Sequence, residues 1–154
     1  MDDKKEDIKK RFWTTFSMAG VLTIIPVFFG LKYLNRMPEQ IAIHFDAAGN
    51  PNQYMARSLA VWIVPVICLV MHILCSVCYY LCLGKVKTVE EKKMLVNLQW
   101  IIPVVSCGAS FMILANALGK SINMVAFAVI IVVVVVALCV VACLPVLMRA
   151  YRKK

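Results

Sequence analysis

Long apolar stretches alternate with short charged or polar segments along the whole chain. The apolar stretches cover residues 13–31, 59–83, 94–118 and 122–148. A transmembrane helix needs about 20 such residues, because in lipid its backbone polar groups must bond within the helix. The pattern therefore predicts an all-α integral membrane protein, in which residues 1–154 form one four-helix transmembrane bundle.

The charged residues 1–11 precede the first apolar stretch, and we interpret them as a solvated tail or a helical extension. A basic start followed by an apolar run is also typical of a signal peptide. The run 13–31 is longer than the usual apolar region of about 7–15 residues, and no small-residue cleavage pattern follows it. We therefore expect it to remain as the first helix.

Local signals mark the expected ends of the other helices. Ser58 is a candidate N-cap for the second helix, and Gly84 stands where a left-handed residue would end it. Thr88 and Glu91 have the spacing of a capping box, so the third helix should begin in water. The link 119–121 is so short that the third and fourth helices must be antiparallel neighbours.

Each predicted span contains one proline. In a membrane helix, proline removes one backbone hydrogen bond and bends the helix. Ordinary kinks explain this pattern, and the hinges of a moving transporter are the alternative. The four residues are Pro26, Pro65, Pro103 and Pro145.

The overall composition excludes an ordinary soluble domain. Hydrophobic residues make up 62% of the chain and charged residues 16%, against about 45–50% and about 25% in soluble proteins. The net charge of +9 comes from lysines and arginines clustered beside the apolar stretches, without interleaved aromatic residues. We therefore expect the lipid bilayer, and not nucleic acid, to be the main partner.

The distribution of positive charge predicts the orientation in the membrane. Thirteen of the 17 lysines and arginines lie in residues 1–11, in the link 85–93 and after residue 148. Under the positive-inside rule, these segments face the cytoplasm. Both termini are then cytoplasmic, and residues 32–57 lie outside a bacterial cytoplasmic membrane.

The extracytoplasmic segment has the pattern of a small hairpin. Residues 41–46 alternate apolar with smaller or polar side chains, the period of two expected of a strand. Residues 48–51 are turn formers, and residues 52–55 can return as a second strand. We expect the face formed by Ile41, Ile43 and Phe45 to lie on the bundle or on the bilayer interface.

This segment also resembles the signature L-P-x-x-I-P-x-H-F-x-x-x-G-x-P-D-x-[YW]-x-[ST]-K of the SdpI-type bacterial toxin-immunity membrane proteins. The resemblance covers about residues 12–83, and the signature stands between the first two spans, as in that family. The chain departs from the signature at Met37, Ala42, Asn52 and Ala56. The resemblance implies a membrane protein that confers immunity. The matching residues are Pro38, Ile41, His44, Phe45, Gly49, Pro51, Tyr54 and, as a basic stand-in for the final Lys, Arg57.

The same segment supplies the candidate ligand-binding residues. His44 and Asp46 are two positions apart on a strand, so they point the same way and can share a proton, a metal or a polar ligand. The structural alternative is that they hydrogen-bond the turn and hold the hairpin shut. One histidine and one carboxylate are too few for a zinc site, and we predict no metal or cofactor. The full candidate set is His44, Asp46, Gly49, Asn50, Tyr54 and Arg57.

Two polar residues inside the membrane are further candidates. His72 in the second helix should face the bundle interior and bond a polar group of the third or fourth helix. Asn116 lies near the outer end of the third helix and is expected to hold helices together.

The cysteines all lie inside predicted spans, so we expect no structural disulfide. In the second helix, a spacing of 4-3-3-4 places four of them and His72 along one face. Packing explains this face, and the alternatives are a soft metal site, palmitoylation or redox chemistry. The five residues are Cys68, His72, Cys75, Cys78 and Cys82.

The sequence has no nucleotide loop, metalloprotease motif or nucleophile elbow. We therefore favour a non-enzymatic bacterial membrane protein that recognises a membrane-active peptide or an envelope component, giving immunity or signalling. The alternatives are a small transporter or channel subunit and, third, a metal-dependent membrane enzyme. A homo-oligomer is compatible with each of these functions.

Overall fold

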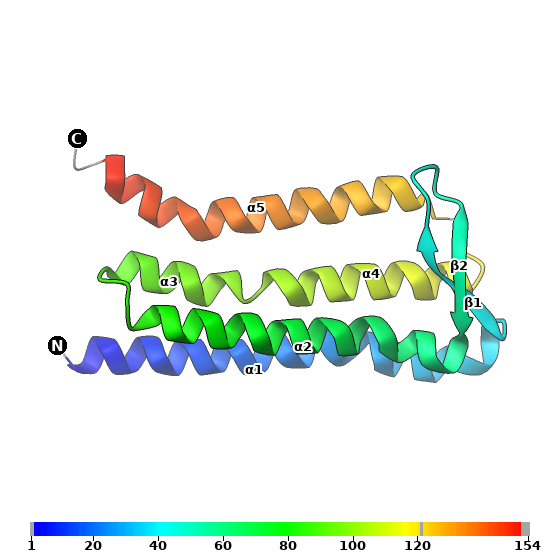
Figure 1. Ribbon diagram of the computed structural model, residues 1–154, viewed down its shortest axis with the longest axis horizontal. Helices are drawn as coiled ribbons and strands as arrows, with labels where there is room; N and C mark the ends of the chain where they lie inside the picture. Colours follow the sequence, from blue (N-terminus) through cyan, green and yellow to red (C-terminus); the bar gives the residue numbers. More distant parts are fainter. Residues whose placement is uncertain (1, 121, 152–154) are drawn as a thin grey trace.

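The computed structural model describes residues 2–120 and 122–151, and for residues 2–5, 145, 147, 149 and 150 it describes the backbone alone. Long helices run side by side and antiparallel, and a two-stranded sheet covers one end of them (Figure 1). Ser121 of the predicted link and the basic residues 152–154 lie outside the described residues. The elements are α1 (Asp2–Tyr33), a 3-10 turn (Leu34–Arg36), β1 (Gln40–Phe45), β2 (Pro51–Ala56), α2 (Arg57–Leu83), α3 (Val89–Leu98), α4 (Ile101–Ala117) and α5 (Met124–Tyr151).

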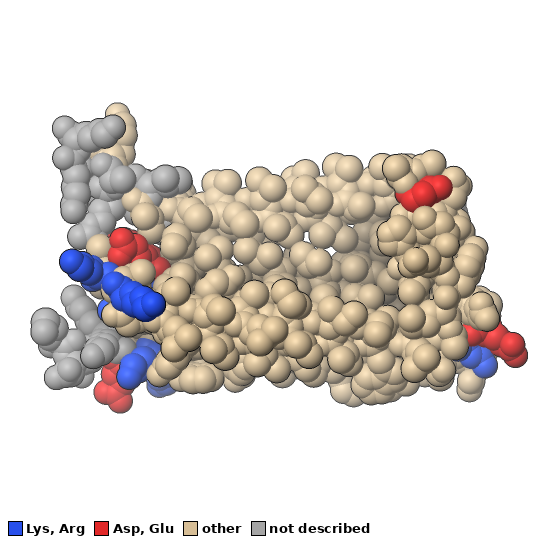
Figure 2. Space-filling model, viewed as in Figure 1, with Lys and Arg blue, Asp and Glu red and all other residues tan. Residues whose placement is uncertain are grey.

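The predicted membrane architecture is confirmed. In the described part of the chain, four helical segments are long and apolar enough to cross a membrane, namely 6–36, 57–83, 89–117 and 124–144. Charged side chains gather at the two ends of the molecule, and the visible face between them carries none (Figure 2). We call the end that carries the sheet the hairpin end. The opposite end, with the start of α1 and the α2–α3 turn, is the tail end.

The predicted end of α2 at Leu83 is confirmed, but the predicted N-cap and the predicted conformation of Gly84 are wrong. The N-cap is Ala56, whose side chain cannot accept a hydrogen bond, and Ser58 lies inside the first turn of α2. Gly84 has φ −73° and ψ −24°, which is right-handed and not left-handed. The backbone amides of Lys85 and Val86 both bond back to the Cys82 carbonyl at 2.9 and 3.1 Å. The Cys82 carbonyl at the end of the helix therefore has hydrogen-bond partners without a residue of positive φ.

The third span is two helices and not the continuous one that the hydropathy predicts. Its start is as expected, because Thr88 and Glu91 form both bonds of the capping box. Between α3 and α4, the amides of Gln99 and Trp100 bond three residues back, at 3.4 and 3.2 Å. Pro103 lacks the amide that would bond the Gln99 carbonyl. The missing amide of Pro103 therefore contributes to the break, although Pro26 and Pro65 lie inside unbroken helices.

The last helix begins at Met124, two residues later than predicted. The Asn123 side chain accepts a hydrogen bond from the Ala126 amide at 3.0 Å, so Asn123 caps this end. At the other end of the chain, α1 extends back to Asp2, so the charged start is a helical extension. As predicted from the short link, α4 and α5 are antiparallel neighbours in contact (Figure 1).

The bundle packs around one apolar cluster at each end, with polar groups between them. The tail-end cluster includes Phe12 and Val96, and the hairpin-end cluster brings together α1, α2, α4 and β1. Between them the Ser106 hydroxyl donates to the Thr23 carbonyl at 3.3 Å, and the Ser76 hydroxyl donates to the Gln99 side chain at 3.3 Å. Such bonds hold membrane helices together, because lipid offers these groups no partner.

The close approach of α1 and α2 at Gly30 generates a stability prediction. A Cβ added at Gly30 would lie 2.5 Å from Val61 Cγ1, whereas at Gly20 it would lie 4.0 Å from its nearest neighbour, in His72. We expect Gly30→Ala to lower the stability by about 1–3 kcal/mol, since a stiff β-branched side chain must move. Thermal unfolding of the purified protein in detergent measures the change.

The matched control is Gly20→Ala, which should unfold at the wild-type temperature or above. Adding Val61→Ala to Gly30→Ala should restore part of the loss, because it removes the clash. If Gly30→Ala alone leaves the unfolding temperature unchanged, α1 and α2 do not pack at this point as described.

Candidate functional site

The hairpin is built as the residue pattern predicts and is anchored by its first strand. β1 and β2 pair antiparallel, with Ile41 opposite Met55 and irregular register on either side of His44. Ile41 is only 1% exposed and belongs to the hairpin-end cluster. Ala42 is buried as well, so the alternation is imperfect at the start of the strand. The buried start of β1 therefore fixes the hairpin on the helices.

Asp46 holds the turn closed. Its carboxylate accepts hydrogen bonds from the backbone amides of Asn50 at 2.8 Å and Ala48 at 2.9 Å, and from the Asn50 side chain at 3.4 Å. Gly49 has φ +86°, a left-handed conformation that favours glycine. The Asn50 backbone amide keeps the pKa of the Asp46 carboxyl below its ordinary value of 3.8. Asp46 thus stays ionised at neutral pH.

His44 and Asp46 do not bond each other. The His44 ring donates from Nδ1 to the Asn52 side-chain oxygen at 2.6 Å, a contact from β1 to β2. Both side chains are exposed. Across the described residues, no group of three or more histidine, cysteine, aspartate or glutamate side chains could hold a metal ion. Asp46 therefore bonds the turn backbone as the structural alternative expects, whereas His44 bonds a side chain of β2 instead.

The other two candidate residues of the segment differ in their surroundings. The Arg57 side chain donates to the Met37 carbonyl at 2.6 Å, and its backbone amide donates to the Glu39 carbonyl at 2.9 Å. Arg57 therefore closes the base of the hairpin where α2 begins. Tyr54 on β2 is 57% exposed and free to meet a partner.

A groove lies between the hairpin and the ends of α4 and α5. Its volume is about 480 Å³, and His44 and Asp46 stand on its hairpin side. A Cβ at Gly49 would lie 3.7 Å from the Met124 Cβ, so the turn itself rests against the start of α5. We call this feature the hairpin groove. Its lining residues are Ile43, His44, Phe45, Asp46, Ala47, Met112, Met124, Val125 and Ala128.

Chemically, the groove combines an adaptable apolar wall with a polar edge. Met112 and Met124 face it from α4 and α5, and methionine side chains fit irregular apolar shapes because they are unbranched and polarizable. The ionised Asp46 and the imidazole of His44 supply charge and hydrogen bonding at one side. Such a site suits an apolar group flanked by a cation.

The four wall residues from α4 and α5 were not found from the sequence. Met112, Met124, Val125 and Ala128 read as ordinary span residues in the hydropathy pattern. Only the folded position of the hairpin brings them beside His44 and Asp46.

The buried histidine has a different partner from the predicted one. His72 is 1% exposed, and its Nε2 donates to the Phe16 carbonyl of α1 at 3.2 Å. Its ring also stacks on the Phe16 ring, with centroids 5.1 Å apart. The expected bond to the third or fourth helix is therefore wrong. Asn116 is half-buried in the last turn of α4, where its backbone carbonyl accepts a hydrogen bond from the Gly119 backbone amide at 2.9 Å.

The cysteine face of α2 does not converge on one site. His72 is buried, Cys68 and Cys75 are half-buried, and Cys78 and Cys82 are exposed toward the surroundings of the helix. All seven cysteines carry free thiols. The face is thus buried near His72 and exposed near the end of α2. This gradient agrees with the packing interpretation, in which the cysteines act as small apolar side chains.

Fold and site together define a multi-pass α-helical membrane protein with a hairpin standing on one end of the bundle. The family described as a domain of unknown function, DUF1648, matches residues 21–69. The matched region runs from α1 through the hairpin into α2, so it contains every hairpin residue singled out above. Neither the curated proteins nor the solved structures include a significant match.

The charge state of Asp46 generates a pH prediction. Because its pKa is lowered by bonds made in the folded hairpin, the stabilisation is complete above pH 3.8 and is lost as the pH falls through the lower folded value. We expect the NMR signals of the Ala48 and Asn50 amides to shift together with a midpoint below pH 3.8. A midpoint for the two amides at or above pH 3.8 would contradict the described turn.

Proposed function

We propose that the protein recognises a membrane-active peptide in the hairpin groove and so protects the membrane or signals the presence of the peptide. The observation that carries the proposal is the groove itself. Its volume of about 480 Å³ accommodates one or two large side chains, and it sets an apolar wall beside an ionised carboxylate. The proposed role is non-enzymatic and uses no metal or cofactor.

The chemistry of the groove supports a peptide that is both apolar and cationic. Met112, Met124 and Val125 offer apolar contact, and Asp46 offers negative charge at the edge. Peptides that act on membranes combine these two features on one amphipathic surface. Tyr54 is exposed on the hairpin, and aromatic side chains of this kind are common binding anchors.

The orientation that the proposal needs is supported by the charge distribution. Among the described residues, more lysines and arginines lie at the tail end than at the hairpin end (Figure 2). We therefore infer that the hairpin faces outward from a bacterial cytoplasmic membrane, with both termini in the cytoplasm. The groove then meets a peptide before the peptide crosses the membrane.

The resemblance to the SdpI-type immunity proteins gives independent support. It rests on eight residues of the segment 37–57, and the DUF1648 match spans the same hairpin. Ile41, Gly49 and Arg57 of that signature have structural roles in the hairpin, as anchor, turn and base. The signature is thus a description of the hairpin that forms one side of the groove.

A transporter or channel subunit is the second candidate. The break between α3 and α4 supports it, because interrupted helices line the binding sites of many transporters. Buried polar side chains lie near this break, including Gln99 with Ser76. A homo-oligomer that encloses a polar path would favour this candidate.

Filling the groove tests the proposal. Cells that express the protein are challenged with synthetic amphipathic cationic peptides, and survival is compared with cells that lack it. Ala128→Phe should reduce protection at least severalfold, because the ring occupies the groove from α5. Ala137→Phe is the matched control, since it is exposed on the same helix and does not line the groove.

Protein abundance in the membrane is measured for both variants. His44→Ala should also reduce protection, whereas the control should protect like the wild type. Equal protection by Ala128→Phe and Ala137→Phe at equal abundance would exclude the groove as the binding site. If the wild type changes survival against none of the peptides, the proposed function is wrong.

A further inference from the structure

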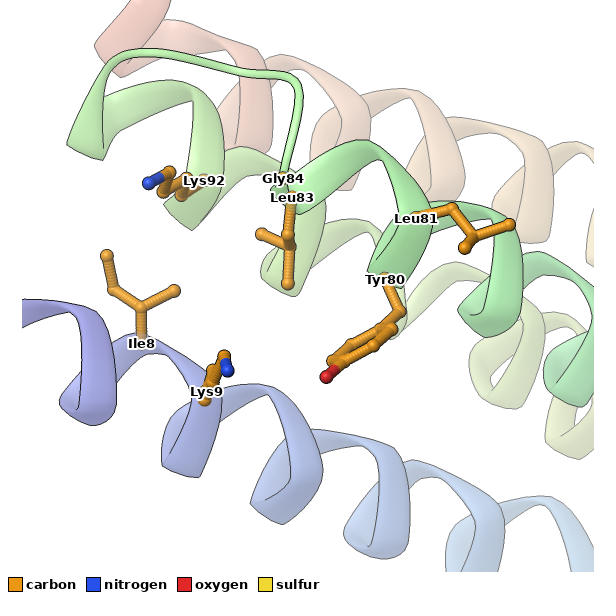
Figure 3. Close-up of a pocket in the computed structure, with 7 residues that line it drawn as sticks. All are labelled: Ile8, Lys9, Tyr80, Leu81, Leu83, Gly84 and Lys92. Atoms are coloured by element: carbon orange, nitrogen blue, oxygen red, sulfur yellow. The ribbon is translucent and has the colours of Figure 1, made fainter.

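A second cavity lies at the tail end, far from the hairpin groove. It has a volume of about 320 Å³ and opens between α1, the end of α2 and the start of α3 (Figure 3). Ile8 points up from α1 and Leu83 points down from α2, so the two form its apolar interior. The Tyr80 side chain extends from α2 toward α1 at one side of the cavity.

Two lysines stand at this cavity, each from a different helix. Lys9 lies on α1 next to Ile8, and Lys92 lies in the first turns of α3 (Figure 3). Among the described residues, none of the side chains that line the cavity is acidic. The Tyr80 hydroxyl points toward the α1 side and adds a hydrogen-bond donor. The cavity therefore has the charge complement of an anion.

The cavity also lies at the boundary between the charged and the apolar parts of the bundle. Trp13 packs beside Tyr80, with ring centroids 5.5 Å apart, and both side chains are exposed. Trp and Tyr prefer the membrane–water interface, because their rings are apolar and carry one polar atom. Leu81, which also lines the cavity, is 63% exposed and faces the region that lipid chains fill.

We propose that this cavity binds one anionic phospholipid. The phosphate lies between Lys9 and Lys92, the Tyr80 hydroxyl donates to the headgroup, and an acyl chain runs along Leu81. A soluble phosphate satisfies the lysines but leaves the apolar interior of Ile8 and Leu83 unused. Zwitterionic lipid adds its own cation beside the lysines, so an anionic headgroup is favoured. The site is independent of the proposed peptide recognition at the opposite end.

The full chain reports on this cavity through Trp13. With Trp62→Phe and Trp100→Phe, Trp13 becomes the single tryptophan. The protein is placed in phosphatidylcholine nanodiscs with increasing mole fractions of brominated phosphatidylglycerol or, in a second series, brominated phosphatidylcholine. Bromine quenches tryptophan fluorescence at short range. Brominated phosphatidylglycerol should therefore quench Trp13 at a lower mole fraction than brominated phosphatidylcholine does.

The variant Lys9→Gln with Lys92→Gln should lose this selectivity. The loss of two lysines should weaken the affinity for phosphatidylglycerol by about 30-fold. The matched control is Lys10→Gln with Lys93→Gln, which removes the same charge one position along each helix. These two residues are exposed and do not line the cavity. The control should keep the selectivity of the wild-type chain.

Inorganic phosphate and glycerol phosphate, added at millimolar concentration, separate the two sources of the anion. Neither should reverse the quenching if the acyl chain contributes. Reversal by either compound would show a soluble-anion site and overturn the lipid assignment. Equal quenching by the two brominated lipids, or equal selectivity in both double variants, would also overturn it.

Discussion

Every backbone amide and carbonyl inside the bilayer needs a partner within the protein, and the rest of the structure depends on this requirement. It is met by the long helices, whose backbone groups bond internally. It also restricts irregular backbone to places where the protein covers it. The break between α3 and α4 occurs at the buried Gln99, and the buried His72 ring bonds a helix carbonyl. In the part of the chain that the structure describes, the one sheet stands at the hairpin end, where its polar groups bond each other.

The position of the hairpin follows from a few buried contacts. Ile41 inserts into the apolar cluster shared by α1, α2 and α4, and Arg57 joins the start of α2 to the backbone before β1. The strands and the Asp46 turn then extend over the start of α5. The groove exists because two separately stabilised parts, a hairpin and a helix pair, meet without filling the space between them. A site of this kind can change its lining residues without changing the fold.

Local patterns were enough to predict the spans and the hairpin, because hydropathy, the period of two and the turn residues act over short distances. They failed where neighbours decide the outcome. Gly84 looked like a left-handed helix end, but the amides after it bond the Cys82 carbonyl in a right-handed turn. Pro103 was interpreted as an ordinary kink, like Pro26 and Pro65, which lie inside unbroken helices. The local sequence does not distinguish such a kink from the separation of α3 and α4. The groove wall at Met112 and Met124 depends on contacts between distant segments, which no local pattern marks.

The proposed function requires that the hairpin rests on α5 and that their groove faces the cell exterior. In a chain with its seven native cysteines replaced, Ala47→Cys and Ala128→Cys place two thiols in the groove lining. A short, membrane-impermeant bifunctional thiol reagent is added to intact cells, and the chain is later cut at a protease site inserted at residues 85–88. We expect the two fragments to stay joined, whereas Ala47→Cys with Ala137→Cys should give separate fragments. Separate fragments from the groove pair, or joining only after the cells are permeabilised, would contradict this arrangement.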